Sequence, residues 1–98
     1  MAVLYISEYV DAGFIGGPQA VAAEPALVNQ TVAIGGTSTA SSAFNSATRL
    51  VRLHTDAICS IKFGTAPTAV ATTARLAANQ TEYFQVRGGE KVAVITNT

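Results

Sequence analysis

The residues of this chain that could carry out chemistry are few, and most of them stand alone. The one histidine, His54, and the one cysteine, Cys59, are five residues apart on what we predict to be two successive strands. A metal site needs three or four such ligands at set spacings, and this pair supplies two. A catalytic Cys–His pair needs an activated thiolate, whereas the alternation of its strand points Cys59 inward. We therefore expect an exposed His54, a core Cys59 and no bound metal.

Two other patterns typical of active sites are incomplete. Glu82 and Glu90 flank a predicted hairpin and are expected to face solvent, although two carboxylates at a suitable distance would serve acid–base catalysis and that alternative stays open. The segment 13–17, GFIGG, lacks the Gly-Lys-Ser/Thr ending and the following helix of a phosphate-binding loop, so we predict a turn there. The sequence thus predicts no catalytic residue and no cofactor site, and the protein is expected not to be an enzyme.

Composition argues against several classes of partner. The 98 residues suit one domain, and 49% of them are apolar while 12% are charged, with a net charge of zero. A nucleic-acid partner would call for a basic face. A membrane span would need about 18–20 apolar residues in a row, which the sequence lacks. The first residues do not resemble a signal peptide, so we expect synthesis in a cytoplasm and no membrane or nucleic-acid partner.

The elements that would position any site are predicted to be strands. β-branched residues dominate the apolar runs, and Gly, Pro, Ser and Thr separate them, which disfavours helix. The predicted strands are 2–10, 30–36, 48–56, 58–64, 81–87 and 91–97. Several short strands with turn signals between them predict an all-β fold with little or no helix, as one small β-sandwich over residues 1–98 or a barrel.

Alternation within these strands predicts which side chains share a face. The residues expected on the core side or on one common face are Val51, Leu53, Cys59, Ile61, Phe63, Phe84 and Val86. The residues expected on the other face are Arg52, His54, Ser60, Lys62, Tyr83, Gln85 and Arg87. The spacer at 88–90 contains two glycines, so we predict a hairpin between the last two strands.

The first strand is apolar on both faces, and such strands are usually covered on both faces. A small sandwich would struggle to cover both by itself, so we expect the chain to self-associate, as a dimer in the first instance and a trimer next. Tyr5 and Tyr9 lie on this strand and suit an interface, because tyrosine offers a large rigid ring tipped with a hydroxyl.

Three connecting segments fit the strand pattern poorly. Segment 11–30 is predicted to be rich in loop, because Pro18 and Pro25 block regular pairing, yet it carries Phe14, Ile15 and Leu27. We expect this segment to pack on a neighbouring protein or second copy, with folding over its own core as the alternative. Segment 37–47 is a bridge of small residues, and segment 70–79 is predicted to be a turn of helix or a weak strand.

Residues 48–96 carry a run of motifs that resembles a known group. The motifs read IKFGTAPTA at 61–69, LAANQTEYFQV at 76–86 and KVAVI at 91–95. The run resembles small virion proteins of tailed bacteriophages, of the capsid decoration or cement kind. The resemblance implies a jelly-roll β-sandwich, no catalysis, and a place on the outside of a capsid with the major capsid protein as partner. The uncharged loop around Pro67 would then be a structural or contact surface.

The predicted function is therefore that of a virion structural protein, a decoration or cement protein that binds and stabilises the phage head shell after synthesis in the host cytoplasm. A phage fibre or spike component that recognises a host surface is the alternative, because both share a fold. A small cupin-like enzyme is a third reading, against which the single histidine counts. The candidate oligomer or capsid contacts are Tyr5, Tyr9, Phe14, Ile15, Leu27 and Pro67.

Overall fold

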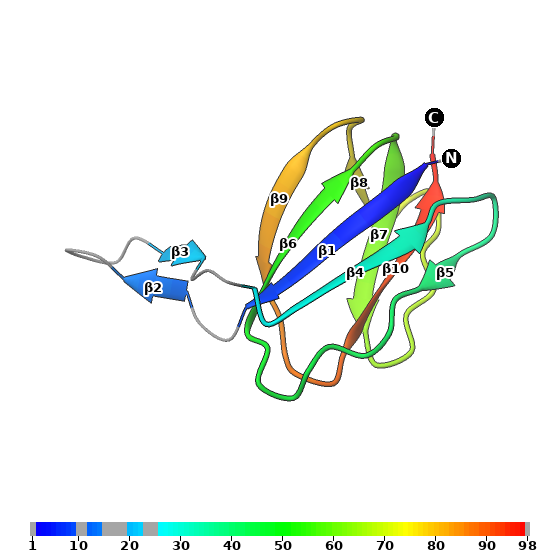
Figure 1. The fold of residues 1–98 in the computed structure, drawn as a ribbon. Helices are drawn as coiled ribbons and strands as arrows, with labels where there is room; N and C mark the ends of the chain where they lie inside the picture. Colours follow the sequence, from blue (N-terminus) through cyan, green and yellow to red (C-terminus); the bar gives the residue numbers. More distant parts are fainter. Residues whose placement is uncertain (1, 10–11, 15–19, 23–25, 98) are drawn as a thin grey trace.

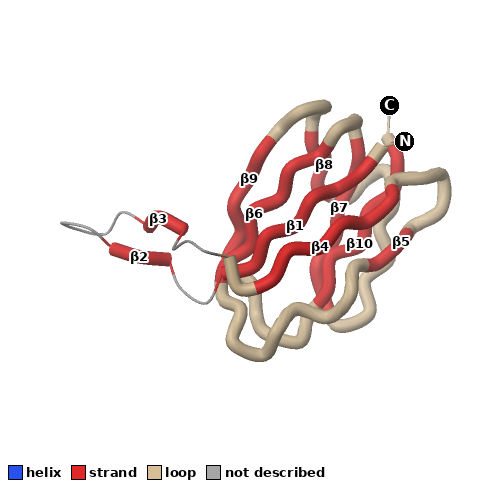
Figure 2. Tube along the Cα trace, viewed as in Figure 1, coloured by secondary structure: helices blue, strands red, loops and turns tan. Residues whose placement is uncertain are grey.

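The computed structural model describes residues 2–9, 12–14, 20–22 and 26–97. Within these residues the regular structure is entirely strand, which confirms the all-β prediction (Figures 1 and 2). The strands are β1 (Val3–Tyr9), β2 (Ala12–Phe14), β3 (Ala20–Ala22), β4 (Val28–Ala33), β5 (Thr39–Ala40), β6 (Leu50–Thr55), β7 (Cys59–Gly64), β8 (Ala74–Leu76), β9 (Thr81–Gln85) and β10 (Lys91–Thr96). In this part of the chain there is no helix long and apolar enough to cross a membrane.

Eight of the strands form two four-stranded sheets that face each other. The front sheet in Figure 1 has the order β4-β1-β6-β9, and the back sheet has the order β5-β10-β7-β8. The buried apolar side chains of both sheets meet between them, as the alternation predicts. The core cluster contains Leu4, Ile6, Val32, Ile34, Phe44, Val51, Leu53, Cys59, Ile61, Leu76, Val92 and Val94, with Phe63, Phe84 and Val86 packed against it.

The pairing of the strands is that of a jelly roll. The antiparallel pairs β7–β8, β6–β9 and β5–β10 are nested like one long hairpin whose tip lies between β7 and β8. The outermost pair is β4 with β1, and the pairs β1–β6 and β10–β7 close the roll. Eight strands in two such sheets make the jelly-roll architecture. Here β1 occupies the position that a strand following β10 would hold.

The two ends of the sandwich chain consequently lie side by side (Figure 1). The backbone amide of Ile34 donates to the carbonyl of Ala2 at 3.0 Å, and the amide of Thr96 donates to the carbonyl of Gly35 at 2.9 Å. Both ends are thus tied to the same short stretch that follows β4.

The predicted hairpin at 88–90 is wrong, because β9 and β10 belong to different sheets. The connection crosses from the front sheet to the back sheet and is held by the segment before β6: the amide of Gly89 donates to Phe44 O at 3.0 Å, and the amide of Phe44 donates to Glu90 O at 2.7 Å. Gly89 has a φ of 85°, which favours glycine. A Cβ at Gly88 would collide with the backbone carbonyl oxygen of Ser46. The two glycines therefore allow the chain to cross from one sheet to the other while its backbone passes close to that of Ser46.

The three connecting segments contain more strand than expected. In segment 11–30, β2 and β3 pair with each other and with neither four-stranded sheet. This pair lies beyond one end of the sandwich in Figure 1. Segment 37–47 contains the short edge strand β5, and segment 70–79 contains β8. The weak-strand alternative for 70–79 is therefore the correct one.

Candidate binding surface

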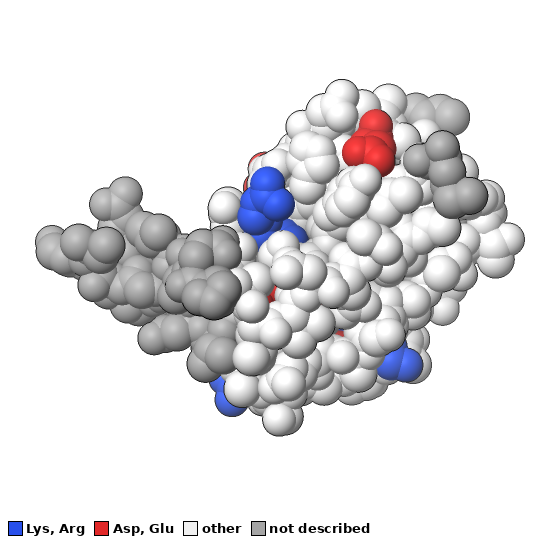
Figure 3. Space-filling view, viewed as in Figure 1, with Lys and Arg blue, Asp and Glu red and all other residues white. Residues whose placement is uncertain are grey.

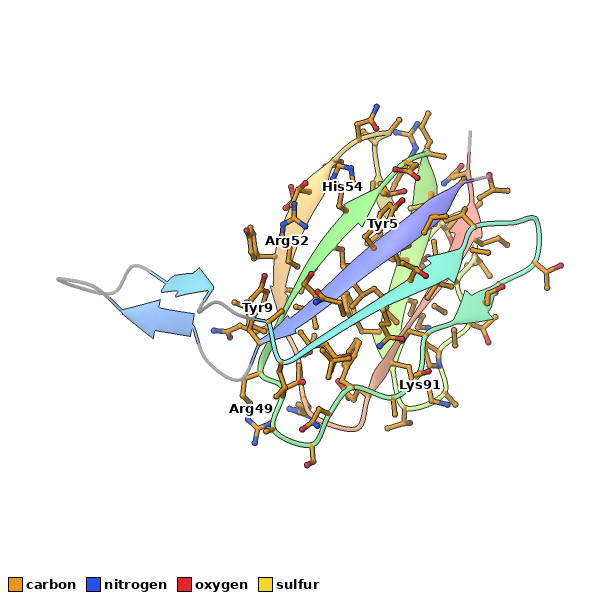
Figure 4. All side chains as sticks on the ribbon, in the orientation of Figure 1. Tyr5, Tyr9, Arg49, Arg52, His54 and Lys91 are labelled. Carbon is orange, nitrogen blue, oxygen red and sulfur yellow. The ribbon has the colours of Figure 1, made fainter. Side chains whose placement is uncertain are left out.

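The outer face of the front sheet carries two exposed aromatic side chains, Tyr5 and Tyr83. The strand registers place outward-facing residues in two rows across the sheet. One row contains Thr31, Tyr5, His54 and Thr81, and the next contains Asn29, Ser7, Arg52 and Tyr83. Figure 4 shows Tyr5, His54 and Arg52 gathered on β1 and β6. Tyr5 is 44% exposed and Tyr83 is 54% exposed.

A shallow groove of about 630 Å³ follows these rows. It is lined by Tyr5, Ile6, Ser7, Asn29, Gln30, Thr31, Arg52 and His54. The face in Figure 3 carries few charged side chains, and these are scattered. The groove therefore combines one exposed ring with neutral polar groups and one cation, the guanidinium of Arg52.

Hydrogen bonds within the sheet hold several of these side chains in place. His54 Nδ1 and Thr81 Oγ1 share a hydrogen bond of 2.8 Å, which leaves Nε2 for a ligand. Ser7 Oγ donates to Asn29 Oδ1 at 2.8 Å, which leaves the Asn29 amide nitrogen as a donor. The rings of Tyr5 and His54 lie 6.3 Å apart, centroid to centroid. The surface is thus organised before any ligand arrives.

The residues considered for catalysis are not brought together. His54 faces outward on β6 and is half-buried, while Cys59 is fully buried in the core. Burial raises the pKa of the Cys59 thiol above its ordinary 9.0, and the hydrogen bond with Thr55 opposes this in part. Such a thiol is a weak nucleophile. Among the described residues, no group of three His, Cys, Asp or Glu side chains could hold a metal ion.

Glu82 and Glu90, which were expected to face solvent, lie in different parts of the fold. Glu82 is exposed on β9 and accepts a hydrogen bond of 2.9 Å from Gln80 Nε2. Glu90 is half-buried in the crossing before β10, where it lines a separate depression with Gln85, Val86 and Arg87.

Glu8 is the one fully buried carboxylate among the described residues. Its Oε1 accepts hydrogen bonds from the Thr48 hydroxyl at 2.8 Å and the Asn45 amide at 2.9 Å, and its Oε2 accepts one from Gln30 Nε2 at 3.0 Å. The side-chain amide of Gln30 also donates to the carbonyl of Ser42 and accepts from the backbone amide of Ser42. All three partners of Glu8 are donors, and they tie β1 to β4 and to the segment before β6. The role of Glu8 is structural.

Part of the outer face of the back sheet is covered by the loop after β7, whereas Lys62 on the same face is exposed. Ala69, in the uncharged loop after β7, is 1% exposed, and its amide donates to Ser38 Oγ at 2.9 Å. The carbonyl of Ala71 accepts hydrogen bonds from Ser60 and Asn97. The loop thus runs from beside β5 to β7 and passes over β10, which lies between them. Ser60, predicted to face outward, is consequently 0% exposed beneath it.

The six predicted contact residues do not form one site. Tyr5 lies on the open front face, whereas Tyr9 is 3% exposed at the end of β1. Leu27 is 42% exposed beside β1, where its amide donates to Glu8 O, and Pro67 is half-buried in the loop over the back sheet. Phe14 belongs to β2, and Ile15 lies outside the described residues.

Tyr83, like Arg52 and Asn29, is a surface residue that sequence reasoning did not single out as a contact. Its outward orientation was predicted, but its position opposite Arg52 depends on the register of β9 against β6. No signal in the sequence gives that register, because the two strands are separated by β7 and β8.

Comparison of the chain with protein-family models, with curated proteins and with solved structures gives no match.

Proposed function

We propose that this protein is a non-enzymatic structural subunit of a bacteriophage head, which binds the major capsid protein from outside and stiffens the shell. The observation that carries the proposal is the β2–β3 pair, which belongs to neither sheet of the sandwich. An isolated two-stranded pair is marginally stable in water, so it gains most by packing against a partner. We infer that this pair is the arm by which the subunit attaches.

The motifs at 61–95 and the jelly-roll pairing support the same reading, since the resemblance stated above implies this architecture. The burial of Cys59 supports it as well, because that thiol is packed in the core, on the other side of the front sheet from the outer face that carries His54. Each copy would contact more than one capsid subunit through weak contacts, and many copies would together resist the internal pressure of a filled head.

Deletion of residues 13–23 tests the attachment arm. The deletion leaves 10–12 and 24–27 to connect β1 with β4, which pair directly at Glu8 and Val28. We expect the isolated protein to melt within a few degrees of the parent and to lose retention on purified heads that lack it, measured by co-sedimentation. A Val70→Ser variant, which alters an exposed apolar side chain in the back-sheet loop, should be retained.

Two outcomes would contradict the arm. A collapse of the melting temperature would place residues 13–23 in the protein's own core packing. Unchanged retention would show that attachment uses another surface.

The alternative reading, a fibre or spike component, differs in stoichiometry. A cement protein should be present in hundreds of copies per particle and a tail fibre in few, which quantitative mass spectrometry of purified particles measures. Self-association as a dimer or trimer stays a prediction, tested by light scattering at micromolar concentration.

A further inference from the structure

We propose that the groove on the outer face of the front sheet binds an acidic saccharide, that is, a sugar chain bearing a carboxylate. This inference is independent of how the subunit attaches to a particle. It rests on three features: the exposed rings of Tyr5 in the groove and of Tyr83 beside it, preformed polar groups, and the Arg52 cation, which has no ion pair among the described residues.

The rings provide stacking surfaces of the kind that sugar rings require. Tyr5 and Tyr83 lie on β1 and β9, two strands apart and in adjacent rows. Strand spacing and rise place their Cα atoms about 12 Å apart. One tyrosine can pack under the apolar C–H face of a sugar while its hydroxyl stays wet. Two at this separation fit a chain of more than one sugar.

The polar groups beside the rings match sugar hydroxyls: His54 lies on β6, between β1 and β9, and Asn29 lies on β4, on the other side of β1. His54 Nε2 and the Asn29 amide nitrogen are free to bond a ligand, because Thr81 and Ser7 occupy the other polar atom of each side chain. Side chains already fixed by neighbours lose less conformational entropy when a ligand binds. A shallow groove lined by ring, amide, imidazole and hydroxyl groups suits a hydrated, hydroxyl-rich ligand better than an apolar one.

Arg52 specifies the acidic class. Its guanidinium lies in the groove, and no hydrogen bond or ion pair to it occurs among the described residues. The nearest cross-strand neighbours of Arg52 are Ser7 and Tyr83, neither of which is acidic. A guanidinium binds a carboxylate through two parallel hydrogen bonds, so an acidic sugar would supply the missing counter-ion.

The experiment titrates the intact protein with matched acidic and neutral probes. The acidic probes are 3′-sialyllactose and trigalacturonate, and the neutral controls are lactose and trigalactose, followed by NMR chemical-shift changes and calorimetry at low salt. We expect at least one acidic probe to bind about tenfold more tightly than its neutral control, with shifts confined to β1, β4, β6 and β9. Added salt should reduce the difference.

Three variants assign the binding to the groove. Arg52→Met should reduce acidic binding to the level of the neutral control, and Tyr5→Ala should weaken binding of both by about tenfold or more. Lys62→Met, which removes an exposed cation from the opposite sheet, should leave binding unchanged. All three positions are at the surface or half-buried, and thermal melting checks that each variant folds.

Several results would overturn the proposal. These are the absence of binding by all four probes at millimolar concentration, equal affinity for acidic and neutral probes, or an undiminished affinity of the Arg52→Met variant. Light scattering that shows a dimer abolished by Tyr5→Ala would also overturn it, because a second copy would then occupy the groove.

Discussion

The two outer faces of the sandwich are built from strands of the same kind but differ in what covers them. On the back sheet, the loop after β7 lies across β10, and Ser60, Ala69 and Ala93 are at most 1% exposed. On the front sheet, Tyr5 and Tyr83 are about half exposed and line or flank a groove. Small side chains permit the close approach of a covering loop, whereas rings and long polar side chains keep a face open.

The loop at 65–73 contains no charged side chain, and it is tied to the back sheet at Ala69 and Ala71. Ala69 is buried against the back sheet, and the backbone of the loop forms hydrogen bonds with Ser38, Ser60 and Asn97. The uncharged loop was expected to be a structural or contact surface. At Ala69, at least, the contact is made within the chain. The exposed rings of Tyr5 and Tyr83 lie on the opposite face of the sandwich.

The largest expected difference in stability is between substitutions of two glutamates, the buried Glu8 and the exposed Glu82. Glu8→Ala would leave the Thr48 hydroxyl and the Asn45 amide without their acceptor and would remove one of the two acceptors of the Gln30 amide, at a cost of about 3 kcal/mol. Glu82→Ala removes an exposed carboxylate and should change stability by no more than about 0.5 kcal/mol. Urea unfolding of both variants measures the contrast. Equal destabilisation would contradict the burial of Glu8.

The next contrast applies the same substitution to the two outer faces. Ala93→Leu adds bulk beneath the covering loop and should destabilise by about 1–3 kcal/mol. Ala33→Leu adds the same bulk to the exposed outer face of β4 and should stay within about 0.5 kcal/mol. In a domain of this size each kcal/mol shifts the melting temperature by about 4–8 °C, so calorimetry resolves the pair. A harmless Ala93→Leu would mean that the loop does not lie over β10.

A smaller contrast concerns two serine hydroxyls. Ser38→Ala removes the acceptor of the Ala69 amide and should cost about 1 kcal/mol, because that amide belongs to a buried residue. Ser7→Ala removes a bond to Asn29 on the open face, where water can replace it. Hydrogen exchange at the Ala69 amide should accelerate only in the Ser38→Ala variant. Acceleration in the Ser7→Ala variant as well would contradict the assignment of this amide to Ser38 alone.

The smallest expected effect is a pH dependence from the interior. Because burial raises the pKa of Cys59, its contribution is fully present below the unfolded value near 9.0 and is lost as pH rises above it, where the unfolded chain ionises first. Between about pH 8 and about pH 10 the parent should lose more stability than Cys59→Ala. Identical pH profiles for the two proteins would show that the thiol is not desolvated.

The sequence was sufficient to predict which side chains of a strand face the core, because this depends on the alternation of apolar and polar residues. Val51, Leu53, Cys59 and Ile61 face the core as their period of two requires, because apolar side chains on one face of a strand must be buried together. Segments 48–56 and 58–64 accordingly match β6 and β7 to within two residues at each end.

What the sequence could not supply depends on contacts between distant segments. Tyr5 and Tyr9 have the same outward parity, yet one is 44% and the other 3% exposed, and nothing local distinguishes them. The glycines at 88–89 have hairpin composition, but the hydrogen bonds of Phe44 direct the chain to the other sheet. The candidate groove required the registers of β1, β4, β6 and β9, which arise only when the roll closes.

A cryo-EM map of the parent particle tests most directly whether the protein is a head subunit with one engaged end and one free face. We predict hundreds of copies on the head, each with β2 and β3 against the shell and with Tyr5, Arg52 and Tyr83 facing solvent. A map with few copies confined to the tail, or with the outer face of the front sheet pressed against the shell, would contradict this.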